Sequence, residues 1–320
     1  MNEPGRACRA QCDVGGVVTL FAGLLLALTP WASVLAQSAN DGFNPNADGS
    51  LDLDFNPGAG DSVFGLARVS LSGKPQGSFA MPVVSGPTNR ERSSRLFMIA
   101  ALVAMALVLI GFAQTYYLKH YFETPALTGV VHLHGAVMTL WFALFATQVM
   151  LIRHNRVHWH RRLGVVGTGL AVLVVLLGSF VAIQSAARGG GPPMLPPLVF
   201  LAIPLGDMLV FTVLFGGAIW LRKRSDWHKR LMLLASLSLL AAAVARIPLD
   251  FIGQGGPLAF FGLVDLVILG CLIYDTAINR RLHPAFGWGL LLIVVSQVVR
   301  LMIAGTDWWM SFAMWLTGAG

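Results

Sequence analysis

Several ionisable side chains lie inside long apolar stretches of this sequence, where an unpaired charge is expensive to bury. They include His134, Asp207, Arg246, Asp265 and Arg300. An imidazole nitrogen can bind haem iron or accept a proton, arginine can bind a carboxylate such as a haem propionate, and aspartate can relay protons. These residues are therefore the first candidates for a binding site, provided that the surrounding helices bring them together.

The surrounding composition is that of a membrane protein. Hydrophobic residues make up 56% of the chain and charged residues 12%, and the mean hydropathy is +0.70. Soluble domains have about 45–50% apolar and about 25% charged residues. The net charge of +7 comes from short basic clusters between apolar runs, which indicates contact with a lipid bilayer and not with nucleic acid. The three cysteines, Cys8, Cys12 and Cys271, form no pattern of metal ligands or disulfides.

Seven apolar runs are long enough to cross about 30 Å of hydrocarbon. The sequence therefore predicts an all-α membrane protein with seven transmembrane helices in residues 90–320. The helices are expected near 96–118, 130–152, 163–184, 196–221, 231–250, 258–276 and 286–304. Lys and Arg precede the first run and fill every second loop, whereas the other loops contain only Lys119 and Arg188. By the positive-inside rule, the bundle begins in the cytoplasm and the C-terminus lies outside.

The first 89 residues differ from this predicted bundle. Residues 1–36 contain arginines, a short apolar run and a small-residue cleavage site, which indicate a signal peptide or, alternatively, an anchor helix. Residues 37–89 are rich in Gly, Pro, Asn and Asp and are expected to form an irregular linker. An exported linker conflicts with a cytoplasmic start of the bundle. We therefore hypothesise that roughly the first 85 residues are foreign to the membrane domain.

Counting 1.5 Å per residue along each predicted helix places the polar residues in the outer half of the membrane and almost none in the inner half. His134 shares one helix stripe with Trp141 and Gln148, whereas His132 points elsewhere. Arg246 and Asp250 have the spacing of an ion pair within one helix.

Asp207, Asp265 and Arg300 need partners from other helices, because an unpaired buried charge is costly. The predicted result is a polar pocket in the outer half of the membrane. Its candidate cofactor-binding residues are His132, His134, Asp207, Arg246, Asp265 and Arg300. No metal site is predicted, because close His and Cys ligand spacings are missing from the sequence.

Two basic loops share the motif Trp-His-[Arg/Lys]-Arg-Leu, at residues 159–163 and 227–231, and a looser copy precedes the last span. This internal repeat predicts one lead helix followed by three helical hairpins. His160 and His228, beside tryptophan and basic residues, are interpreted as anchors at the headgroup level.

The motifs HRRLG at 160–164 and HKRLM at 228–232 resemble those of poorly characterised bacterial multi-pass membrane families. One of these families includes a maturation factor for haem-copper cytochrome oxidase. The resemblance implies a bacterial inner membrane and partners among respiratory-complex subunits. Residues 48–74 resemble a single repeat of bacterial β-propellers.

Three functions fit these observations, and whether any of them is enzymatic stays open. The first is a respiratory-chain accessory or redox protein that binds haem or a quinone, with His134 as axial ligand or proton acceptor and Arg246 and Arg300 on an anionic group. The second is a transporter of protons or small solutes with His134, Asp207 and Asp265 as a relay. The third is a scaffold subunit, in which the same residues only fix helix packing.

Overall fold

The computed structural model describes residues 89–320 apart from 123, 125, 193–194 and 319–320. The predicted signal peptide or anchor at 1–36, the linker at 37–89 and the propeller-like stretch at 48–74 therefore lie outside the described residues, except for Asn89.

The described part of the chain consists of helices joined by turns and contains no strand, and seven of its segments are long and apolar enough to cross a membrane. The predicted all-α membrane fold is thus confirmed. The helices are α2 (Asn89–Gly111), α3 (Gly129–Arg153), α4 (Val157–Ala187), α5 (Pro197–Phe200), α6 (Ala202–Trp220), α7 (Ser225–Ser238), α8 (Ala241–Val244), α9 (Asp250–Asn279), α10 (Pro284–Ile303) and α11 (Asp307–Thr317). A π-helical turn, η1 (Ala113–Tyr117), and a 3-10 turn, η2 (Lys119–Tyr121), follow α2.

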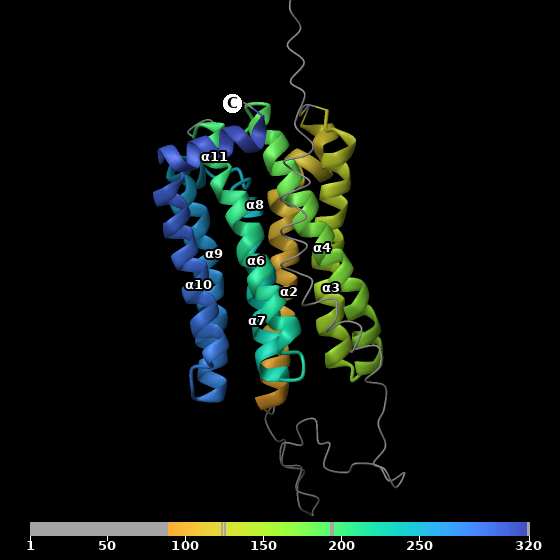
Figure 1. The fold of residues 1–320 in the computed structure, drawn as a ribbon. Coiled ribbons are helices and arrows are strands. Elements are labelled where there is room, and N and C mark those ends of the chain that lie inside the picture. Colours follow the sequence, from red (N-terminus) through yellow and green to blue (C-terminus); the bar gives the residue numbers. More distant parts are fainter. Residues whose placement is uncertain (1–88, 123, 125, 193–194, 319–320) are drawn as a thin grey trace, which may run out of the picture.

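The long helices form a bundle with α2, α6 and α7 in the middle (Figure 1). The α3–α4 hairpin packs on one side of this centre and the α9–α10 hairpin on the other (Figure 1). Each predicted hairpin is present as a pair of contacting helices: α3 with α4, α6 with α7, and α9 with α10. The beginning of α2 and the α3–α4, α6–α7 and α9–α10 connections all lie at one end of the bundle, which we call the basic end (Figure 1).

Two spans are interrupted at positions that the sequence explains. The fifth span breaks after Ser238 and continues as the short α8, whose Ala243 carbonyl approaches α2 closely. A Cβ atom on Gly111 would lie 2.1 Å from the oxygen of Ala243, so only glycine fits at this crossing. In α9, Gly256 has a φ of 54° before Pro257, and the helix bends there because proline removes a hydrogen-bond donor.

The fifth span lies earlier in the chain than predicted. The sequence placed it at 231–250, whereas the apolar helical segment is Ser225–Val244. The prediction treated Arg230 as part of a basic loop. In the structure this arginine is buried, because Asp275 pairs with it, so the helix begins six residues sooner.

The last helix, α11, was not predicted. It crosses the end of the bundle opposite the basic end (Figure 1). Thr306 caps it by accepting a hydrogen bond from the backbone N–H of Trp309, whose indole N–H donates to the Leu198 carbonyl at 2.8 Å. Trp308 and Trp315 stay largely exposed. A short helix with one buried face and exposed tryptophans is typical of the membrane–water interface.

Candidate functional site

The first polar group joins α6 to α10 through a buried ion pair. Arg300 Nη1 donates to Asp207 Oδ1 at 2.5 Å and to the Ile203 carbonyl oxygen at 2.9 Å. The same guanidinium lies 5.0 Å from the centre of the Phe261 ring on α9. Gly206 makes room for this arrangement, because a Cβ atom there would lie 1.9 Å from Arg300 Cδ. Asp207 and Arg300 therefore satisfy each other, as the sequence required of partners from different helices.

Asp265 belongs to the same region. Its Oδ1 accepts a hydrogen bond of 3.0 Å from Gln297 Nε2, one helical turn before Arg300 on α10. Counted along their helices, Asp207, Asp265 and Arg300 lie about 20–24 Å from the basic end, at one depth. The predicted convergence of these three residues is therefore present in the structure.

His134 and Arg246 form a second group, on the other side of the bundle. The Nδ1 atom of His134 is buried and has no hydrogen-bond partner within the described part of the chain. Arg246 lies close enough to act on His134 electrostatically. Its guanidinium donates to the Ala242 carbonyl at 2.7 Å and lies over the Phe112 ring, 4.9 Å from the ring centre. This pair combines an imidazole with an open nitrogen and a cation bounded by an aromatic ring.

His132 does not belong to this pair. It is exposed, and its carbonyl oxygen accepts a hydrogen bond of 3.0 Å from the Tyr116 hydroxyl. The predicted difference in direction between His132 and His134 is thus present. The predicted ion pair of Arg246 with Asp250 is not formed, because the helix is interrupted between α8 and α9 and the four-residue spacing no longer places the two side chains on one face.

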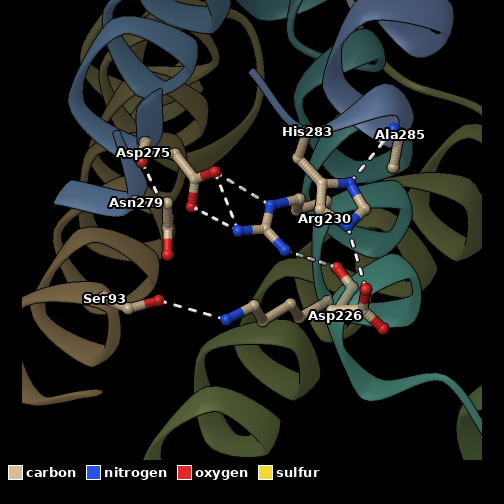
Figure 2. A network of polar contacts seen from close by, with 8 residues as sticks. Ser93, Asp226, Arg230, Asp275, Asn279, His283 and Ala285 are labelled. Atoms are coloured by element: carbon tan, nitrogen blue, oxygen red, sulfur yellow. Dashed lines mark hydrogen bonds and ion pairs between the residues drawn. The ribbon is translucent and has the colours of Figure 1, made fainter. Parts of the chain in front are cut away.

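The basic end contains a network that the sequence analysis missed (Figure 2). Arg230 on α7 binds Asp275 on α9 through both guanidinium nitrogens that face it, Nε at 2.9 Å and Nη2 at 2.8 and 3.0 Å. Their side chains are only 4% and 1% exposed. Beside them, His283 Nε2 lies 3.0 Å from Asp226 Oδ2, although Asp226 is 56% exposed.

The expectation that the inner half holds almost no polar groups was therefore wrong. Asp275 fell inside the predicted sixth span, so the general rule for charges within spans already marked it as a candidate. Arg230 was not recognised as a buried residue, because the motif at 227–231 was interpreted as a basic loop.

Two histidines of the repeated motif also meet. The rings of His160 on α4 and His228 on α7 have centres 6.3 Å apart, and His228 Nδ1 lies 2.8 Å from the Ala218 carbonyl oxygen. His160 Nδ1 is buried and unpartnered within the described residues. Trp159 is 52% exposed and suits an interfacial anchor, but the two histidines face inward. The equal position of His160 and His228 in the two copies of the repeat was the signal that could have predicted their meeting.

Unpartnered polar atoms gather along α3. Six buried side-chain nitrogen or oxygen atoms lack a hydrogen-bond partner among the described residues, and four belong to α3 and α4. On α3 they are His134 Nδ1, Trp141 Nε1 and Gln148 Oε1, spaced seven residues apart and so about 10 Å apart on one face. Buried polar groups normally have a partner, so this face is the part of the bundle best suited to bind water or a ligand.

Comparison of the sequence and the fold with protein-family models, curated proteins and solved structures found no match. The residues themselves therefore carry the functional argument. Within the described residues, no three His, Cys, Asp or Glu side chains gather as metal ligands. The helices support one class of molecule, a multi-pass membrane protein, because seven of them are long and apolar enough to cross a bilayer.

Proposed function

We propose that this protein is a membrane redox or respiratory-chain accessory protein that binds haem or a quinone in the half of the bundle away from the basic end. His134 would be the axial ligand or the hydrogen-bond partner of the bound group, and Arg246 would bind an anionic substituent such as a propionate. The observation that carries the proposal is the buried Nδ1 of His134, which has no hydrogen-bond partner among the described residues and lies within the electrostatic reach of Arg246.

The chemistry of the donor set fits either ligand. An open imidazole nitrogen can coordinate haem iron, and it can also hydrogen-bond a quinone carbonyl. Phe112 and Tyr116 supply aromatic surface near it, and Gly135 lets the Tyr116 ring pack directly on α3. Our proposal narrows the predicted set to His134 and Arg246, because Asp207, Arg300 and Asp265 already bind partners on neighbouring helices.

The visible spectrum of the full-length protein, expressed with haem and purified in mild detergent, tests the proposal. We expect a Soret band that is lost or shifted in His134→Ala and unchanged in His132→Ala. The second variant is a matched control, because His132 lies two residues away on the same helix but is exposed. A band that survives both substitutions would remove His134 as the ligand.

A colourless protein would exclude haem and leave a quinone as the candidate ligand. Quinone binding is tested by measuring how a soluble quinone analogue quenches the tryptophan fluorescence. Trp141, buried on the same stripe as His134, is a suitable reporter. We expect saturable quenching that weakens about tenfold or more in His134→Ala, because the loss of one buried hydrogen bond to a ligand costs on the order of 1.5–3 kcal/mol. The absence of both a Soret band and saturable quenching would overturn the redox proposal.

A second function, proton transfer, is favoured by the line of unpartnered atoms from His134 through Trp141 to Gln148. Water molecules bound to such atoms could connect the two halves of the membrane. Proton flux into liposomes containing the protein should then fall at least about tenfold in Gln148→Leu. Flux equal to that of empty liposomes would exclude this function.

A further inference from the structure

A hollow of about 460 Å³ opens at the basic end, between the first turn of α2 and the turn that connects α9 to α10. Its volume lies within the range of about 300–1,000 Å³ that is common for ligand pockets. Arg92, Arg280 and Arg281 line it together with Ala277, Ile278 and Asn279. Three cations, one on α2 and two in the turn after α9, therefore share one concave surface.

These three arginines are exposed, and they form no hydrogen bond or ion pair with any residue that the structure describes. Arg280 also ends α9 with a φ of 53°, a left-handed conformation that glycine or asparagine usually occupies at this position.

The basic residues next to the hollow are already engaged (Figure 2). Arg230 binds Asp275, and Lys229 donates to the Ser93 hydroxyl at 3.2 Å. Asn279, which lines the hollow, donates its side-chain amide to the Asp275 carbonyl at 2.7 Å. Asp275 is thus neutralised from the inside by Arg230, and the three arginines of the rim outnumber Glu91, the acidic neighbour of Arg92 on α2.

We propose that this hollow binds the phosphate group of an anionic phospholipid. The ends of the spans place the hollow at the level of the headgroups, where basic pockets between transmembrane helices bind such lipids. Arginine suits this role because its planar guanidinium can donate two hydrogen bonds to one phosphate. The side chains of Ala277 and Ile278 give the same hollow an apolar wall beside the cations. This site is separate from the one around His134 and does not depend on haem or quinone binding.

Native mass spectrometry of the full-length protein in mild detergent tests the proposal with equimolar phosphatidylglycerol and phosphatidylcholine. We expect retained phosphatidylglycerol, and at least about a tenfold loss of its affinity when Arg92, Arg280 and Arg281 are all replaced by Gln. The control replaces Arg153, Arg156 and Arg161 by Gln. It removes the same charge from exposed positions at the same end but outside the hollow, and should leave the affinity unchanged.

The other outcomes are decisive as well. An equal loss in both triple variants would mean that binding follows only the net charge of the basic end, and would overturn the proposal. Equal retention of the two lipids by the unaltered protein would do the same. If equimolar inorganic phosphate displaces the lipid, the hollow is a site for free phosphate; displacement that requires a large excess supports the phospholipid. A melting curve of each variant in detergent verifies that it is folded.

Discussion

Removing one member of the buried pair of Arg230 and Asp275 should destabilise the protein more than removing both members together. Replacing Asp275 by Leu leaves a guanidinium that is 4% exposed with only the Asp226 carbonyl, 2.8 Å away, as a partner. Replacing Arg230 by Met leaves a carboxylate that is 1% exposed without its three close contacts. Each single substitution should therefore destabilise the protein by about 3–5 kcal/mol, because it leaves one buried charge uncompensated.

The double variant, Arg230→Met with Asp275→Leu, should recover most of that loss. It removes both charges and keeps nearly the same volume between α7 and α9, so no buried charge remains. We expect its free energy of unfolding to lie within about 1.5 kcal/mol of the unaltered protein. The coupling energy between the two positions should then be at least about 4.5 kcal/mol.

Unfolding in mixed micelles, followed by tryptophan fluorescence, gives the four free energies of this cycle. A loss of 3–5 kcal/mol corresponds to roughly a 150- to 4,500-fold fall in the ratio of folded to unfolded protein, which shifts the midpoint far outside experimental error. The reasoning is refuted if the two single losses simply add in the double variant. It is equally refuted if either single substitution costs less than about 1 kcal/mol, since the pair would then be solvated.

Two further substitutions test other parts of the structure. Asp226→Asn should cost less than about 1 kcal/mol in the same unfolding assay, although it also removes an ion pair, because this aspartate is 56% exposed and His283 retains a neutral partner. Gly206→Ala should cost about 1–3 kcal/mol, since its Cβ atom would displace the side chain of Arg300, whereas Gly270→Ala, with open space around it, should be neutral or slightly stabilising. If the Gly206→Ala variant were as stable as the Gly270→Ala variant, Arg300 could move aside without any loss in the free energy of unfolding.

The number and order of the membrane helices could be predicted because each span is a local property of the sequence. About twenty apolar residues between polar loops predict a helix wherever it later packs. The residue at which the fifth span begins could not be predicted in this way. Whether Arg230 lies in a loop or in a helix depends on Asp275, which is 45 residues away in the sequence. Similarly, α11 is too short for a span and is recognised only from the buried face around Trp309.

The candidate site could likewise be predicted only in part. The depth of Asp207, Asp265 and Arg300 in the membrane could be predicted, because depth follows from counting residues along a helix. Their partners could not be predicted, since the rotation of α6, α9 and α10 about their axes is decided by packing. Gly206 illustrates this: its missing side chain decides where Arg300 lies, but nothing near it in the sequence shows that an arginine passes there.

The polar groups of this bundle divide into two kinds, and the division bears on function. On α6, α7, α9 and α10, charged groups are paired: Arg300 with Asp207, and Arg230 with Asp275. A pair that satisfies both members holds helices together and has little left to offer a ligand. On α3 and α4, the buried imidazole, indole and amide side chains each have an atom without a hydrogen-bond partner among the described residues.

A ligand gains most binding free energy where it forms hydrogen bonds to buried groups that have no partner in the protein, because those groups have already lost their water. The α3–α4 hairpin is also the part of the bundle that packs at one side of the central helices (Figure 1). Small changes in its position alter the space along the His134 stripe without breaking either ion pair, since both pairs lie on other helices. The structure thus separates the helices that maintain the fold from the helices on which we expect binding, and substitutions in the two groups should affect stability and ligand affinity independently.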